Sequence, residues 1–257
     1  MSATPAAARH VRVVDVPLRV PGQDDIARAW LVGDDDHDGR PRPGILWLHW
    51  LGHRHNDRGE HLPLAVELAA RGVVSLLPAG HFPWVPDPDG TANDVQRVRD
   101  QVAAHAVALD HLCAQPGVDP GRIALVGHDY GGMYGALLAD QDERISTLAL
   151  QALDDSWANW FASFWLRLEG PARAEYAERF AGLEPVDAVG RLAERLGKRM
   201  LFQWAGNDTF VTPAVRAAYE GANPKASSIE YADAEHMLDD RAARDLSAFL
   251  VERLGLG

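Results

Sequence analysis

Residues 123–139 read IALVGHDYGGMYGALLA, and this stretch decides the fold. Four apolar residues predict a short strand, a glycine-rich turn follows, and small residues then begin a helix. A strand-to-helix turn this tight strains its central residue, Asp129, and requires small residues two positions before and after it. Gly127 and Gly131 meet that requirement. The turn therefore predicts that Asp129 stands clear of a sheet edge, beside the amide N–H groups that follow it.

Strand-like and helix-like segments alternate on both sides of this turn. Such alternation is typical of an α/β protein with a mostly parallel sheet. We expect a single domain over residues 1–257, with about eight strands and helices on both faces. Residues 11–20 and 27–32 are β-rich and separated by Pro21-Gly22, which predicts an antiparallel opening pair. Later strands are expected at 45–50, 73–78, 123–126, 145–153, 200–204 and 228–231.

Residues 156–190 break the alternation, because they are helical in pattern, aromatic, and interrupted by Gly170-Pro171 and Pro185. We interpret this segment as a short helical lid inserted over the carboxyl edge of the sheet.

Two polar residues come after later strands, in the order that a catalytic turn requires. Asp208 follows the strand ending at residue 204, and His236 follows the strand ending at residue 231. Taken singly, Asp208 suits a turn and His236 suits a surface or helix-entry position. The shared order favours a nucleophile–acid–histidine triad of Asp129, Asp208 and His236.

From Pro43 onward the sequence resembles the α/β-hydrolase superfamily, in particular its dienelactone-hydrolase-like and acyl-peptidase-like branch. The matching segments are residues 62–65 (LPLA), 69–72 (AARG), 118–123 (VDPGRI) and 201–208 (LFQWAGND). The resemblance assigns Asp129, Asp208 and His236 to the triad and implies no cofactor and no metal. By position it assigns the oxyanion donors to the backbone N–H groups of Leu51 and Tyr130.

This chain departs from that branch at two positions. Trp50 replaces a glycine of the oxyanion loop, and Asp129 replaces a serine or cysteine. Aspartate at the nucleophile position is typical of the epoxide hydrolases and haloalkane dehalogenases of the same fold. A carboxylate attacking an acyl ester would form a reactive anhydride, whereas attack on an epoxide or a carbon–halogen bond forms a stable alkyl ester. His236, oriented by Asp208, would then activate water to hydrolyse that ester.

Aromatic residues of the lid and nearby loops are candidates for substrate contact, although aromatic side chains at helical spacing also serve packing. The candidates are Trp50, Trp84, Trp157, Trp160 and Trp165. Tyr130, Tyr134 and Tyr176 are further possible donors to a leaving group. The group formed by His49, His53, His55, His61 and Asp57 is interpreted as loop residues without a metal.

The net charge of −12 argues against nucleic acid or an anionic membrane as a partner. One cysteine, Cys113, and the lack of an apolar signal region predict a cytoplasmic protein. The expected partner is a small-molecule substrate, and the sequence leaves a homodimer open.

Three functions remain open on the sequence alone. The first is a hydrolase that acts through a covalent Asp129 ester, with epoxide or carbon–halogen hydrolysis favoured. The second uses Asp129 as a general acid or base in a lyase, isomerase or cyclisation reaction. The third is a non-catalytic binding protein, against which the presence of both Asp208 and His236 counts.

Overall fold

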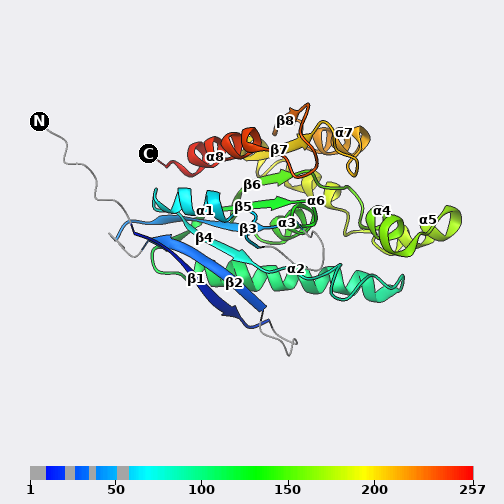
Figure 1. The fold of residues 1–257 in the computed structure, drawn as a ribbon, viewed down its shortest axis with the longest axis horizontal. Helices are drawn as coiled ribbons and strands as arrows, with labels where there is room; N and C mark the ends of the chain where they lie inside the picture. Colours follow the sequence, from blue (N-terminus) through cyan, green and yellow to red (C-terminus); the bar gives the residue numbers. More distant parts are fainter. Residues whose placement is uncertain (1–9, 21–26, 35–38, 51–57, 257) are drawn as a thin grey trace, which may run out of the picture.

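The computed structural model describes residues 10–20, 27–34, 39–50 and 58–256. Its centre is an eight-stranded sheet with the order β1-β2-β4-β3-β5-β6-β7-β8 (Figure 1). The strands are β1 (Val11–Leu18), β2 (Ala27–Asp34), β3 (Arg42–Leu48), β4 (Val74–Pro78), β5 (Val118–His128), β6 (Ile145–Gln151), β7 (Met200–Ala205) and β8 (Ser227–Tyr231).

The strand β2 runs antiparallel to both β1 and β4, and every pairing from β4 to β8 is parallel. The predicted antiparallel opening pair and the mostly parallel sheet of about eight strands are therefore confirmed. Parallel strands are buried on both faces, which explains why every residue of β3 and β4 is buried.

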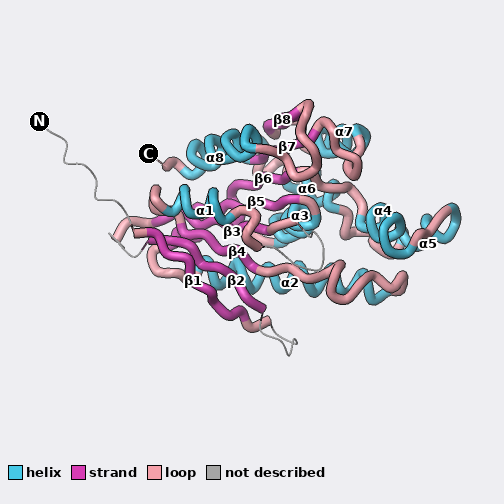
Figure 2. The backbone as a smooth tube through the Cα atoms, in the orientation of Figure 1, coloured by secondary structure: helices cyan, strands magenta, loops and turns pink. Residues whose placement is uncertain are grey.

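Helices cover both faces of the sheet (Figure 2). The helices are α1 (Leu62–Ala69), α2 (Ala92–Cys113), α3 (Tyr130–Gln141), α4 (Trp157–Trp160), α5 (Gly170–Glu178), α6 (Pro185–Leu192), α7 (Pro213–Ala222) and α8 (Asp240–Leu254). Side chains of β3 alternate between two cores: Ile45 and Trp47 pack with α1 and α8, whereas Leu46 and Leu48 pack with α2 and α3. A one-residue alternation is the period of a strand, so one sheet separates the two cores.

The segment after β6 forms a small cap at the end of the molecule toward which the parallel strands point (Figure 1). It consists of α4, a π-helix (Phe161–Leu166) and α5. The predicted lid extended to residue 190, but α6 packs against α3 and α7. The end of the predicted lid is therefore corrected: α6 buries Ala188, Val189 and Leu192 against the body and belongs to the helical layer.

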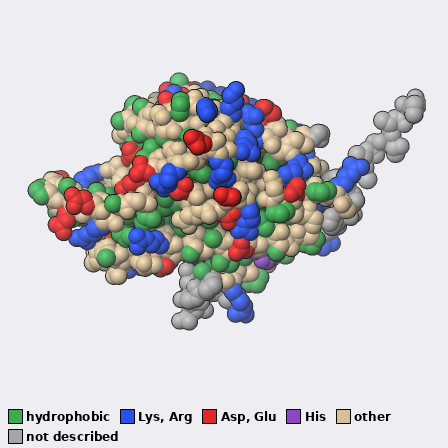
Figure 3. Space-filling model, turned by 180° about the vertical axis from the view of Figure 1, so that it is seen from behind, with side chains coloured by type: hydrophobic (Ala, Val, Ile, Leu, Met, Phe, Trp, Pro, Cys, Tyr) green, Lys and Arg blue, Asp and Glu red, His purple; other side chains and the backbone are tan. Residues whose placement is uncertain are grey.

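The surface seen from behind interleaves basic and acidic side chains (Figure 3). Within the described residues, no helix combines the length and the apolar character that crossing a membrane requires.

Candidate active site

The turn after β5 places Asp129 at the carboxyl end of the central strand. Its backbone has φ of 56° and ψ of −124°, a conformation that L-residues rarely adopt. A Cβ on Gly127 would collide with the carbonyl of Gly131, and a Cβ on Gly131 would collide with the carbonyl of Leu48. Both glycines are therefore needed for close backbone approach, as the sequence indicated.

Asp208 lies in the turn after β7, where its two carboxylate oxygens have different partners. Oδ1 accepts the backbone N–H groups of Phe210 and Val211, at 2.8 and 3.0 Å. Oδ2 accepts a hydrogen bond from Nδ1 of His236 at 2.8 Å. The same side chain thus holds the turn and contacts His236, two positions that the sequence offered as alternatives.

His236 lies between two carboxylates. Its Nε2 atom is 3.7 Å from Oδ1 of Asp129, which is within ion-pair range but longer than a hydrogen bond. Burial lowers the pKa of His236, but the nearby carboxylates of Asp129 and Asp208 outweigh it and raise this pKa to about 9. The free site therefore holds an imidazolium at neutral pH.

Asp129 is nearly inaccessible, with 4% of its surface exposed. Burial raises its pKa, and His236, His128 and a backbone hydrogen bond from Tyr130 partly offset that effect. Conversely, although burial opposes it, the hydrogen bond from His236 lowers the pKa of Asp208. The pKa values of Asp129 and Asp208 are thus shifted in opposite directions by their surroundings.

Aromatic rings surround the exposed side of His236. Phe210 lies 5.0 Å and Trp160 6.2 Å from its ring, centroid to centroid, both edge to face. Trp160 also packs against Tyr130 with their centroids 4.6 Å apart. Sequence analysis did not single out Phe210, because its only signal is that it stands two residues after the acid.

Two buried donors in this aromatic layer have no hydrogen-bond partner among the described residues. They are the indole N–H of Trp160 and the hydroxyl of Tyr130. Such groups are costly to bury unless something completes their hydrogen bonding.

The remaining predicted aromatic positions differ from one another. Trp157 is fully buried and donates its indole N–H to the carbonyl of Leu183, so it packs the cap against the body and is not free to bind substrate. Its predicted substrate role is corrected for that reason. Trp84 and Trp165 are half-buried, and their ring centroids are 4.7 Å apart. Trp50 is half-buried and lies two residues after the end of β3.

The hydroxyl donors that the sequence offered besides Tyr130 are already occupied. Tyr134 donates to the carbonyl of Phe82, and Tyr176 donates to Asp94 on α2. Both tyrosines therefore link separate segments of the fold through hydrogen bonds.

The predicted first oxyanion donor, Leu51, lies outside the described residues. His53, His55 and Asp57 lie outside them as well. Contrary to the expectation of open loop residues, His49 and His61 are buried. His49 accepts a hydrogen bond from the Gly80 N–H and contacts the Trp50 carbonyl, so both of its ring nitrogens have main-chain partners. The described residues hold no group of three or more acidic, histidine or cysteine side chains suited to a metal.

The sheet order, the strained turn and the sequence of acid and histidine together define the α/β-hydrolase fold. No protein-family model matches the chain. The chain is 27% identical to the dihydrolipoyllysine-residue acetyltransferase component of the acetoin cleaving system from Cupriavidus necator, over 96% of this chain and 74% of that protein.

Solved structures with the same fold are similar over nearly the whole chain. A protein assigned as a dienelactone hydrolase from Klebsiella pneumoniae superimposes with a TM-score of 0.64 at 15% identity, covering 96% of this chain and 100% of that one. Est1E from Butyrivibrio proteoclasticus superimposes with a TM-score of 0.71 at 14% identity, covering 94% and 99%. These likenesses establish the fold, whereas the chemistry depends on the residues of the site itself.

Proposed function

We propose that this chain is a hydrolase that opens an epoxide or a carbon–halogen bond through a covalent ester on Asp129. The observation that carries the proposal is the position of a carboxylate, in place of a hydroxyl, at the strained turn and 3.7 Å from a histidine that is hydrogen-bonded to Asp208. A carboxylate needs no base to activate it, so the histidine is left for the second half of the reaction.

In the first half-reaction, an oxygen of Asp129 attacks a saturated carbon of the substrate. A carbon–oxygen ester bond forms, and the bond from that carbon to halide or to the epoxide oxygen breaks. The unpartnered N–H of Trp160 and O–H of Tyr130 are suited to stabilise the departing halide or alkoxide.

Ester formation also changes His236. Asp129 loses its negative charge, and with it one of the two interactions that raise the pKa of His236 to about 9. The imidazolium then releases a proton, to the alkoxide of an opened epoxide or to solvent after halide leaves. His236 thereby becomes a neutral base at the stage that needs one.

In the second half-reaction, Nε2 of His236 removes a proton from water, and the water oxygen attacks the carboxyl carbon of Asp129. The tetrahedral intermediate collapses, and the product leaves as an alcohol after taking the proton from His236. The Asp129 carboxylic acid then passes its proton to His236, which restores the imidazolium. One oxygen of the regenerated Asp129 carboxylate comes from water.

The test is a single turnover in H₂¹⁸O with an aryl epoxide or a 1-bromoalkane as the probe, followed by mass spectrometry of the peptide containing Asp129. The proposal predicts one ¹⁸O atom in Asp129. Turnover without label in Asp129 would rule out the covalent ester.

A second candidate is general acid–base catalysis by Asp129. It is favoured by the burial that raises the pKa of Asp129, because a carboxyl group so shifted exchanges protons closer to neutral pH. This candidate predicts turnover of a substrate with no adduct and no label. Direct acyl transfer, which the name of the Cupriavidus necator relative describes for that protein, would require an anhydride at Asp129.

A further inference from the structure

A second acid–histidine pair lies directly behind the triad. His128, the residue before Asp129, points its Nδ1 atom at Oε1 of Glu60 at 2.5 Å. Its Nε2 atom faces the main-chain carbonyl of His236 at 3.0 Å. The rings of His128 and His236 are 5.4 Å apart, centroid to centroid. Sequence analysis assigned no role to either Glu60 or His128.

Glu60 also contacts the segment that follows β3. Its Oε2 atom accepts the backbone N–H of Trp50 at 2.8 Å. Trp50 ends the described part of the segment after β3, and it directly precedes the predicted oxyanion donor Leu51. Glu60 and His128 therefore connect three main-chain positions that are distant in sequence: the end of β3, the nucleophile turn and the histidine loop.

The partners indicate the charge state of His128. A main-chain carbonyl can only accept, so Nε2 of His128 must carry a proton. A carboxylate also accepts, so Nδ1 carries a proton as well. Burial lowers the pKa of His128, but the charge and hydrogen bond of Glu60 outweigh it and raise this pKa. Burial likewise raises the pKa of Glu60, and the histidines around it bring it well below its usual range.

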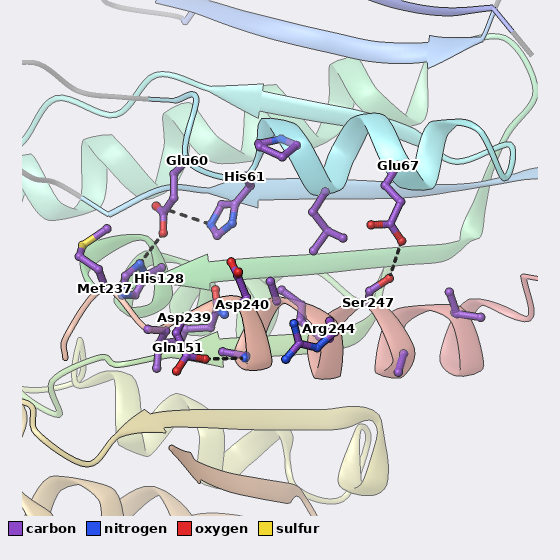
Figure 4. Close-up of a pocket in the computed structure, with 18 of the residues that line it drawn as sticks. Glu60, His61, Glu67, His128, Gln151, Met237, Asp239, Asp240, Arg244 and Ser247 are labelled. Atoms are coloured by element: carbon purple, nitrogen blue, oxygen red, sulfur yellow. Dashed lines mark hydrogen bonds and ion pairs between the residues drawn. The ribbon is translucent and has the colours of Figure 1, made fainter. Parts of the chain in front are cut away.

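The pair lines a pocket of about 710 Å³ between α1 and α8, on the opposite face of the sheet from α2 and α3. Figure 4 shows Glu60 pointing at His128 there, with His61 beside it. Asp129, Asp208 and His236 are not among the residues that line this pocket. His61 lies 3.7 Å from Glu60 and is almost fully buried. Glu60 therefore meets two imidazoles and one amide.

We infer that Glu60 and His128 are positioning residues, a buried carboxylate–imidazolium pair that ties the end of β3 to the histidine loop and places a positive charge beside Asp129. A serine nucleophile is neutral and needs no such charge. A buried aspartate must be kept ionised, and a fixed cation on the adjacent residue favours that form. The kinetic part of this inference rests on the proposed function, whereas the charge state of His128 does not.

The first measurement needs no substrate. We expect imidazole ¹⁵N NMR of histidine-labelled protein to show both nitrogens of His128 protonated between pH 6 and 8. The substitution Glu60→Gln should make His128 neutral, because an amide can donate to Nδ1 while Nε2 keeps its bond to His236. The matched control is Glu67→Gln, in α1 on the wall of the same pocket, where the glutamate is exposed and accepts a hydrogen bond from Ser247.

His128 is assigned as the doubly protonated imidazole that loses one proton in Glu60→Gln and not in Glu67→Gln. His61 lies 3.7 Å from Glu60 without a hydrogen bond to it, so its resonances should only shift. An unprotonated nitrogen on His128 in the unsubstituted protein would overturn the inference, because the pair would then be neutral. This result would leave the Asp129 ester untouched, so the two proposals fail separately.

The second measurement is the pH profile of Asp129 alkylation by the epoxide probe. In Glu60→Gln we expect the acid limb to move up by about one pH unit, because Asp129 loses the positive charge of His128. Glu60→Ala also removes the tie to Trp50, and it should slow ester hydrolysis more than Glu60→Gln does. Profiles and hydrolysis rates that match those of Glu67→Gln would overturn the positioning role. If no probe alkylates the unsubstituted protein, the proposed function fails and the NMR result still decides the charge state.

Discussion

Nε2 of His236 lies 3.7 Å from Oδ1 of Asp129, so a cation and an anion face each other without a hydrogen bond between them. This relationship explains why the pKa of His236 is raised and why it should change during a reaction. It also makes the charge of Asp129 measurable through its neighbour.

Replacing Asp129 with asparagine should lower the pKa of His236 from about 9 toward its ordinary value. The substitution removes one of the two carboxylates that favour the imidazolium, and Asp208 alone remains. Proton NMR titration of the imidazole checks this. Asp208→Asn is the matched comparison, because it removes the other carboxylate. An unchanged pKa in Asp129→Asn would show that the 3.7 Å contact has no electrostatic effect.

Replacing His236 with glutamine should separate the two half-reactions. Alkylation of Asp129 needs no base and should continue, whereas hydrolysis of the ester should fall by roughly 100-fold or more. The adduct should therefore accumulate and appear as a mass increase on the peptide containing Asp129. Asp129→Asn is the control and should form no adduct. Full turnover by His236→Gln would remove the histidine from the mechanism.

Replacing Trp160 with phenylalanine should slow alkylation by about 10- to 100-fold, because phenylalanine keeps an aromatic ring but lacks the unpartnered indole N–H. Trp157→Phe is the comparison: its N–H is already donated to Leu183, so its loss should lower the free energy of unfolding by about 1–3 kcal/mol. Adduct formation and chemical denaturation measure the two effects. Equal alkylation rates in both variants would assign the Trp160 N–H to packing alone.

Replacing Asp129 with serine should create weak esterase activity, since it places a hydroxyl beside a histidine that is still held by Asp208 at 2.8 Å. Release of p-nitrophenol from p-nitrophenyl acetate provides the assay. The double variant Asp129→Ser, His236→Gln should lose whatever activity the single variant gains. Activity that survives in the double variant would mean that the hydroxyl is not activated by this histidine.

Replacing Gly127 with alanine should destabilise the fold by about 3 kcal/mol, because the new Cβ meets the backbone of Gly131 and backbone cannot move aside cheaply. Gly221→Ala, in α7, is the control, since nothing lies within 4 Å of the Cβ it would add. Urea denaturation compares the two. Equal stability of both variants would show that the turn can relax.

The sequence was enough to predict the sheet, the opening strand pair and the turn that holds Asp129. Each of these depends on local information: apolar runs set the strands, Pro21-Gly22 marks the hairpin, and Gly127 and Gly131 mark the tight turn. The order of Asp208 and His236 along the chain was also readable, because parallel strands bring their carboxyl ends to one edge of a sheet.

The tertiary structure alone decided which side chains are already committed to other partners. Nothing in the sequence distinguishes Trp157, whose indole N–H is bonded to Leu183, from Trp160, whose indole N–H has no hydrogen-bond partner among the described residues. Likewise, Glu60 meets His128, 68 residues away in sequence, only because the turn that leads into α1 packs against the end of β5. Hydrogen bonds between distant segments depend on how the helices pack against the sheet. The periodicity of a segment predicts which face it buries, but it does not predict which atoms that face contacts.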